Sequence, residues 1–152
     1  MSQARPSYRE YVAGLHGDAG PLQLLCRPLA AGSLVELWRL WNPAYTWLLR
    51  WFVYAALRRW LPGRPARLVT FLVCGFALHD LPFLYLPAAL RGAAWPWPFT
   101  TLLFLLLGLE VELTRATGLS WAGWPAWSRV LVNLLALGSA GAAAAAVVVA
   151  LG

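Results

Sequence analysis

Long apolar runs, separated by short segments rich in proline, glycine, tryptophan and arginine, dominate the pattern of the chain. The two longest runs cover residues 68–90 and 130–151, and the second contains no charged residue. A helix rises about 1.5 Å per residue, so each run is long enough to cross a hydrocarbon layer about 30 Å thick. We therefore predict a transmembrane helix over each of them.

Residues 44–61 form a third apolar run that carries a regular polar pattern. Thr46, Arg50, Tyr54 and Arg58 recur at every fourth position. Residues at this spacing share one arc of a helix. The pattern predicts an amphipathic helix in the headgroup region, with Arg50, Tyr54 and Arg58 at the interface. A spanning helix is the alternative if Arg50 faces other segments of protein.

The fourth apolar run, residues 95–113, begins with a turn that two prolines stiffen. Trp95 and Trp97 in this turn are typical of a membrane interface. The run is short for a crossing. We expect it to span with the tryptophan turn in the headgroups at one end and Glu110 and Glu112 in the headgroups at the other.

The region before these runs is of mixed composition. Prolines and glycines interrupt any long periodicity in residues 1–32, which predicts a loop-like leader on the cytoplasmic side. Ser33, with Glu36 three residues later and an apolar run behind it, predicts the start of a short helix. The sequence thus predicts an all-α integral membrane protein with three to four hydrophobic helices, divided into the leader and a single membrane domain at 33–152.

The composition supports a membrane protein. The chain has 152 residues, of which 61% are hydrophobic and 12% charged, whereas a soluble domain is about half apolar and a quarter charged. All 12 basic residues are arginines, and with 6 acidic residues the net charge is +6. Because the arginines flank the apolar runs instead of covering one soluble face, they argue against nucleic-acid binding. They predict an integral protein of a cytoplasmic or bacterial-type inner membrane, with residues 1–67 and 114–129 in the cytoplasm and 91–98 outside.

His79 and Asp80 are the only strongly polar residues of the run 68–90. Ionisable groups deep in a membrane are costly, and they are by default candidates for function. Adjacent helix residues point about 100° apart, so these two side chains cannot form a His–Asp pair in a regular helix. Pro82 has no N–H for the carbonyl of Leu78, which predicts a kink beside His79. The alternative is a structural histidine held by one hydrogen bond between helices.

Two sequence blocks resemble the membrane-bound O-acyltransferase (MBOAT) family. Residues 38–42, Trp-Arg-Leu-Trp-Asn, and the following Trp-Leu-Leu-Arg-Trp-Phe-Val-Tyr at 47–54 are similar to the family's aromatic–Arg–x–Trp–Asn block. Residues 71–79, Phe-Leu-Val-Cys-Gly-Phe-Ala-Leu-His, are similar to the family's helix with an intramembrane histidine. The resemblance covers residues 33–90 and corresponds to the C-terminal part of much longer family members.

The resemblance implies acyl transfer inside the bilayer. His79 would act as the general base that deprotonates an acceptor hydroxyl, and Asn42 would help to position a thioester donor such as acyl-CoA. No tightly bound cofactor is implied, and other membrane subunits would complete the enzyme, which would be split or diverged. Asn42 also has a structural interpretation, as an N-cap before Pro43.

Two other interpretations compete with an acyltransferase. The first is a non-catalytic accessory subunit of a larger membrane complex, photosynthetic or respiratory, in which the tryptophans contact lipid and neighbouring subunits and His79 is structural. The second is a protein in which His79 ligates the metal of a tetrapyrrole, haem or chlorophyll. No other metal site is predicted, since Cys26 and Cys74 lie far apart in the sequence.

Overall fold

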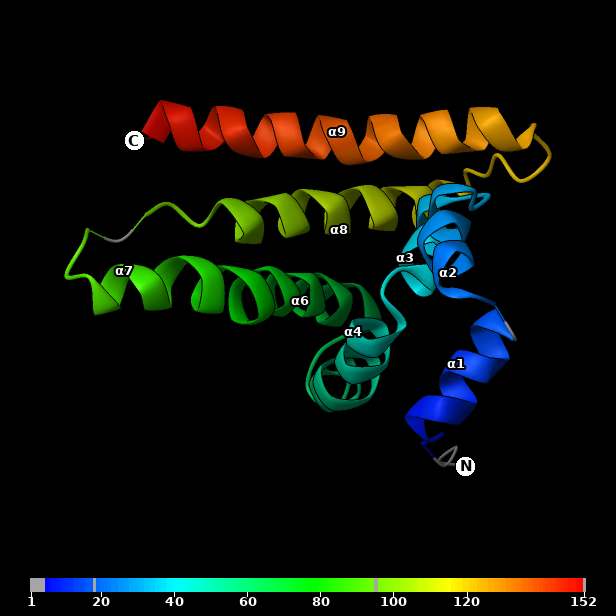
Figure 1. Ribbon diagram of the computed structural model, residues 1–152, viewed down its shortest axis with the longest axis horizontal. Helices are drawn as coiled ribbons and strands as arrows, with labels where there is room; N and C mark the ends of the chain where they lie inside the picture. The colour runs from blue at the N-terminus through cyan, green and yellow to red at the C-terminus, as the bar shows by residue number, and fades with distance from the viewer. Residues whose placement is uncertain (1–4, 18, 95, 152) are drawn as a thin grey trace.

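The computed structural model describes residues 5–17, 19–94 and 96–151 (Figure 1). All regular structure in these residues is helical. The elements are α1 (Tyr8–His16), α2 (Pro21–Leu29), α3 (Leu34–Leu40), α4 (Pro43–Leu48), η1 (Leu49–Tyr54), α5 (Ala55–Leu57), α6 (Gly63–Gly75), η2 (Phe76–Tyr85), α7 (Leu86–Leu90), α8 (Phe99–Thr117) and α9 (Ala126–Leu151), where η marks a π-helix. Because α4–η1–α5 and α6–η2–α7 each run without a break, the described residues form seven continuous helices.

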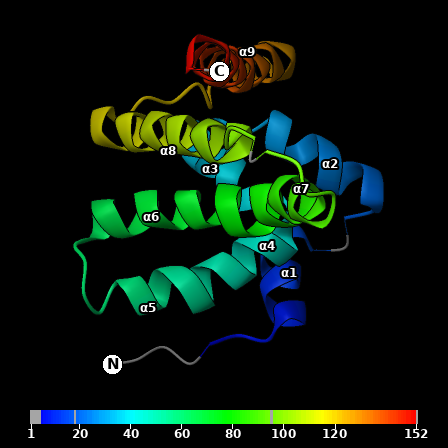
Figure 2. The same ribbon diagram turned by 90° about the vertical axis from the view of Figure 1, so that its left-hand side faces the viewer.

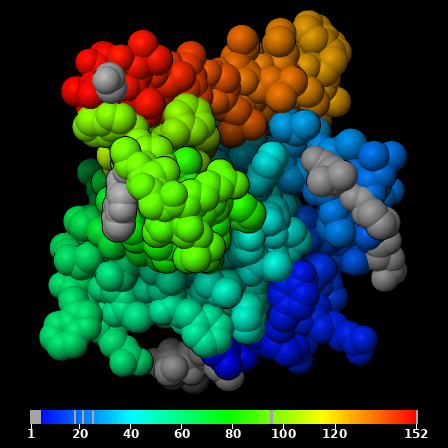
Figure 3. All heavy atoms as spheres, turned by 60° about the vertical axis from the view of Figure 1, so that its left-hand side comes forward, coloured from blue at the N-terminus to red at the C-terminus, as the bar shows by residue number. Residues whose placement is uncertain are grey.

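Three long helices make up the body of the protein. The continuous helix α6–η2–α7, α8 and α9 lie side by side, and α8 packs between the other two (Figure 1). The helices α1 to α4 gather at the end where α8 leads into α9. Seen from the side, α4–η1–α5 turns back beneath α6 (Figure 2). The space-filling view shows α9 as a ridge along the outer edge of the molecule (Figure 3).

Two helices are long and apolar enough to cross a membrane. They are Gly63–Leu90 with 28 residues and Ala126–Leu151 with 26 residues, and few of their residues are buried inside the protein. Large apolar side chains such as Phe83 and Val149 are 74% and 82% exposed. Length, composition and uncovered apolar surface are what a bilayer requires of a spanning helix.

The predicted apolar helices are present, but some of their ends differ from those expected. The helix expected after the proline turn begins at Phe99 as predicted, and Pro98 disfavours helical backbone at the residue before it. This helix continues to Thr117 and ends at Gly118, which has a left-handed φ of 67°. The last helix starts four residues earlier than expected, directly after Pro125.

The prediction of a loop-like leader was wrong, since the region contains α1 and α2. Ser7 and Glu10 form a capping box at the start of α1, with Ser7 N–H donating to Glu10 Oε2 over 2.7 Å. Gly17 ends that helix with a φ of 57°. The second helix begins with Pro21 in its first position, where a missing N–H costs nothing. Both helix starts follow from local sequence signals.

The end of α2 is tied to residues that lie about a hundred positions further along the chain. Asn133 of α9 donates from Nδ2 to the carbonyls of Leu29 and Ala31, over 2.7 and 3.0 Å. Trp121 donates from Nε1 to the carbonyl of Ala31 over 2.9 Å, in the same buried cluster as Leu37. The last carbonyls of a helix have no partner within the helix. Asn133 and Trp121 supply donors for these groups and anchor the N-terminal helices to the body.

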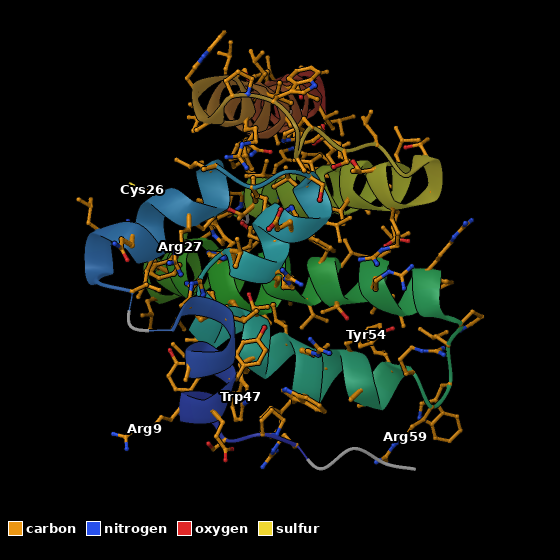
Figure 4. All side chains as sticks on the ribbon, turned by 90° about the vertical axis from the view of Figure 1, so that its right-hand side faces the viewer. Arg9, Cys26, Arg27, Trp47, Tyr54 and Arg59 are labelled. Atoms are coloured by element: carbon orange, nitrogen blue, oxygen red, sulfur yellow. The ribbon has the colours of Figure 1, made fainter. Side chains whose placement is uncertain are left out.

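The imidazole of His16 is buried at the end of α1. His16 is 2% exposed, and neither ring nitrogen makes a hydrogen bond to a described residue. Arg27 of α2 donates to the carbonyl of His16 over 2.8 Å and lies between α1 and α2 (Figure 4). Burial, together with the positive charge of Arg27, lowers the pKa of His16 below its ordinary value of 6.5.

We expect acidification to loosen α1 and α2. Unfolded His16 takes up a proton near pH 6.5, whereas the folded form does so only at a lower pH. Above pH 6.5, His16 is neutral in both states and does not reduce the free energy of unfolding. As the pH drops from 6.5 towards the folded pKa, this free energy falls, by about 1.4 kcal/mol for each unit by which folding lowers the pKa. Hydrogen exchange of α1 amides between pH 7 and 5 tests this. His16→Phe should remove the dependence, and an unchanged dependence in that variant would contradict the prediction.

Candidate functional site

Asn42 caps the helix that begins with Pro43. Its Oδ1 accepts a hydrogen bond from the N–H of Tyr45 over 3.4 Å, and its backbone adopts a left-handed φ of 35°. The N-cap interpretation is thus confirmed. The carboxamide nitrogen of Asn42 makes no hydrogen bond to a described residue, and the side chain is exposed. Its N–H₂ group is therefore free to donate to a ligand.

His79 lies in η2, between two aromatic rings from other helices. The imidazole stacks on Phe104 of α8, with ring centroids 5.0 Å apart and planes inclined by 22°. Tyr45 of α4 meets it edge-on at 5.9 Å. The fold therefore brings Asn42 and His79 to neighbouring elements, which Tyr45 connects. Neither ring nitrogen of His79 makes a hydrogen bond to any residue that the structure describes, and the side chain is partly exposed.

An aromatic cluster extends from His79 into the core. Trp38 of α3 packs against Phe104 at 5.7 Å and against Phe71 of α6 at 5.3 Å. It also contacts Trp41 at 6.1 Å. Tilted and edge-to-face pairs at these distances are favourable packing arrangements for aromatic rings. The cluster makes one side of the His79 environment rigid and apolar.

Asp80 has a structural role that the sequence did not indicate. Its carboxylate is 1% exposed and accepts from the N–H groups of Thr100 and Thr101 over 3.1 and 2.6 Å, and from the Thr101 hydroxyl over 2.6 Å. The first N–H groups of α8 have no partner within their helix. A negative charge at this end also suits the helix dipole. Asp80 therefore caps α8 from a neighbouring helix and does not assist His79.

Gly75 permits the close approach that this cap requires. A Cβ atom at Gly75 would lie 2.7 Å from Thr101 Cα and 2.8 Å from the carbonyl oxygen of Thr100. Any larger residue would push the start of α8 away from α6. One turn beyond Thr100 is Phe104, the ring on which His79 stacks. Gly75 and Asp80 thus determine where Phe104 lies beneath the imidazole.

The helix widens into π-helix around His79 instead of continuing as α-helix. The π-helical segment covers Phe76–Tyr85 and contains Pro82, which cannot donate a backbone hydrogen bond. A second π-helical segment, Leu49–Tyr54, lies in the helix that carries the residues expected at the interface. Such segments are rare in proteins, and those that occur are often found at functional sites. The disturbance that Pro82 predicts next to His79 therefore takes the form of a π-helix.

Arg50 and Tyr54, expected at the membrane interface, also contact other parts of the protein, while Arg50 remains exposed. The guanidinium of Arg50 lies 5.5 Å from the ring of Trp51 and interacts with Tyr11 of α1. Burial raises the pKa of Tyr11, and Arg50 partly offsets this effect. Tyr54, labelled in Figure 4, interacts with Arg67 of α6. The polar arc of this helix is therefore used at least in part for contacts between helices.

The remaining interface residues are at helix ends. Arg58 is exposed and donates to the carbonyl of Leu61 over 2.6 Å. Trp97 is 43% exposed in the turn before α8, while Trp95 lies outside the described residues. Trp60, before α6, is 86% exposed. Exposed tryptophans at the ends of apolar helices are typical of a membrane interface.

Glu112 contacts protein instead of reaching out from the end of α8. It forms a bidentate ion pair with Arg67 of α6, in which Nη2 and Oε2 are 2.6 Å apart. Arg115 adds a contact of 3.6 Å to the same carboxylate. This cluster joins the start of α6 to the end of α8. It lies at the end of the bundle opposite Arg91, which follows α7.

Away from His79, other kinds of ligand site can be sought among the described residues. Among the described residues no group of three or more His, Cys, Asp or Glu side chains could hold a metal ion. Two open apolar grooves lie on the long helices, one between α8 and α9 and one along η2 and α7, and His79 lines neither of them. Comparisons of the chain with protein-family models, curated proteins and solved structures found no match.

Proposed function

We propose that this chain contributes a catalytic histidine and a donor-positioning asparagine to an MBOAT-like acyltransferase embedded in a membrane. The observation that supports this best is the edge-on contact of His79 with Tyr45, the residue that Asn42 caps, while neither imidazole nitrogen makes a hydrogen bond to a described residue. The resemblance assigns Asn42 and His79 to the reaction from sequence alone. The contact between their elements is an independent feature of the fold.

The reaction would use His79 as a general base. One ring nitrogen accepts the proton of an acceptor hydroxyl as its oxygen attacks the carbonyl carbon of a thioester. The new C–O bond forms, the C–S bond breaks, and the protonated imidazole returns its proton to the thiolate that leaves. Phe104 holds the imidazole plane by stacking. The free N–H₂ group of Asn42 is placed to donate to a polar group of the thioester.

Additional helices would be needed to enclose the site. His79 is partly exposed, and the neighbouring apolar side chains Phe76 and Leu81 are 45% and 46% exposed. A thioester in contact with water is open to hydrolysis, so an acyl-transfer site benefits from closure. We infer that helices of other membrane subunits, or of a second copy of the chain, cover this face.

A non-catalytic accessory subunit is the second candidate function. The observation in its favour is that Asp80 and Gly75 serve the packing of α8 and that His79 fits between two aromatic rings. In this case the exposed face of η2 would dock on a larger membrane complex. Ligation of a tetrapyrrole by His79 is the third, and it predicts a visible absorption band that His79→Ala alters.

Cross-linking of the protein in its native membrane, followed by its isolation, tests the proposal. Phe83, 74% exposed on the same segment as His79, is replaced by a photoreactive phenylalanine, and cross-linked partners are identified by mass spectrometry. We expect a cross-link to another membrane helix, and transfer of radiolabelled acyl groups from acyl-CoA to hydroxyl lipids by the isolated assembly. Recovery in a pigment or electron-transfer complex would favour the accessory role. Recovery as a monomer without acyl transfer would contradict the proposal.

A further inference from the structure

The groove between α8 and α9 combines an apolar lining with a carboxylate oxygen, Glu110 Oε2, that has no hydrogen-bond donor among the described residues. Its volume is about 490 Å³, within the range of small-molecule sites, and it is open along one side. The lining residues are mostly apolar, among them Leu106, Leu109, Leu113 and Ala143, and they include Glu110 and Ser139. The two helices lie side by side at the outer edge of the bundle (Figure 1). Among the described residues that line the groove, Glu110 is the only ionisable one.

The carboxylate of Glu110 is poorly satisfied by the protein. Its Oε2 is buried and makes no hydrogen bond to any described residue. Its Oε1 lies 3.3 Å from Ser139 Oγ, which lies closer, at 2.9 Å, to the carbonyl of Ala136. A serine hydroxyl has one proton, so it cannot donate to both acceptors at once. Unsatisfied polar groups in such a setting call for an external donor.

The position of Glu110 fits the head of a membrane lipid. It lies seven residues before the end of α8 at Thr117, about 10 Å along the helix, on the side of the bundle where Arg67 pairs with Glu112. The groove continues past it to Leu106 and Ala143, in the direction of the far end of both helices. A head at Glu110 would therefore place an acyl chain along the deeper apolar part.

We propose that this groove binds a single-chain lipid whose head carries a hydrogen-bond donor, either a hydroxyl or an ammonium group. The donor bonds to the Glu110 carboxylate, and the chain lies between α8 and α9. The unsatisfied carboxyl oxygen of Glu110 is a hydrogen-bond acceptor and is therefore complementary to a donating head, and the groove is open along one side. His79 packs against the start of α8 and against α4. The two sites are thus separate, and failure of either proposal leaves the other unaffected.

Photolabelling of the full chain in nanodiscs of dioleoylphosphatidylcholine tests the proposal, because this headgroup has no hydrogen-bond donor. Three probes carry the same diazirine-bearing oleoyl chain and differ in the head: a monoacylglycerol, a primary amine and a methyl ester without a donor. We expect the first or the second to label α8 and α9 at least about tenfold more than the ester, since a hydrogen bond to a charged group has this effect. Whichever of these two probes labels the helices more strongly shows whether the head is a hydroxyl or an ammonium group.

Variants separate binding from helix packing. Glu110→Leu should remove the preference for a donor, while Glu110→Gln should remove the preference for the amine and retain part of that for the hydroxyl. Ala143→Leu fills the groove and should lower labelling by all probes. Ala89→Leu, in the groove along η2 and α7, is the matched control and should change nothing. The proposal would be overturned if the ester labelled the helices as strongly as the other probes, or if Glu110→Leu left the labelling by the preferred probe unchanged. Cross-linking of a partner helix into the groove would also overturn it.

Discussion

His79→Gln is expected to lower the rate of acyl transfer by the isolated assembly about 10²- to 10⁴-fold, the usual contribution of a general base. Glutamine occupies a similar volume but cannot take up a proton at neutral pH. Neither imidazole nitrogen bonds to a described residue, so the substitution breaks no hydrogen bond that holds the fold. The rate is measured as transfer of radiolabelled acyl groups from acyl-CoA. The amount of assembly and its melting temperature should not change.

Two controls show whether the loss belongs to proton transfer. Tyr45→Phe keeps the ring that meets His79 edge-on and removes only the hydroxyl, so the rate should stay within about a factor of three. His16→Phe removes the other histidine, which lies in α1 and belongs to no part of the proposed site, and should leave the rate unchanged. A His79→Gln assembly with the original rate would place the base on another residue. It would then favour the accessory role.

The long helices could be predicted from the sequence because a bilayer imposes a simple rule. A run of about twenty apolar residues satisfies its backbone only as a helix. Such a run is visible at 68–90 and at 130–151, and both helices are present. The proline turn also marked the start of the helix at Phe99, whereas the continuation of that helix to Thr117 was not expected. Composition predicted the apolar helices, and local chemistry placed their boundaries.

The short N-terminal helices were missed for a different reason. Their local signals exist, since Ser7 and Glu10 form a capping box and Pro21 occupies a first helical position. Helices of nine residues are marginal by themselves, so propensity alone does not decide whether they form. Here the end of α2 is held by Asn133 and Trp121, which lie about a hundred residues away. No local pattern contains that information.

The candidate site, like the fold, was predictable only in part from the sequence. Asn42 and His79 were identified from sequence blocks, and the cap that Asn42 forms was visible in the local sequence, but the contact of His79 with Tyr45 appears only in three dimensions. Phe104 was not predicted as a neighbour of His79, because its place depends on the register between η2 and α8. That register is determined by Asp80 and Gly75. The pair Thr100 and Thr101 at the start of α8 is visible in the sequence, but no sequence pattern indicated that Asp80 would contact it.

Replacement of Asp80 should have the largest effect on stability. Asp80→Leu removes the acceptor of two backbone N–H groups and leaves both buried without partners. A buried unsatisfied group costs about 1–3 kcal/mol, so we expect a loss of about 2–5 kcal/mol in the free energy of unfolding. Asp80→Asn keeps one acceptor oxygen and should lose less. Titration with a denaturing detergent, followed by circular dichroism, gives the difference between the variants and the original protein.

Thr101→Val separates the two parts of this cap. It removes the hydroxyl bond to Asp80 Oδ2 and preserves both backbone bonds, so its loss should be the smallest of the three, about 1 kcal/mol. An Asp80→Leu protein as stable as the original would show that water or lipid groups satisfy α8. If the cap does hold α8, its loss also moves Phe104 away from His79. The acyl-transfer rate should then fall in Asp80→Leu although Asp80 touches no substrate, which links the packing of the helices to the chemistry proposed for them.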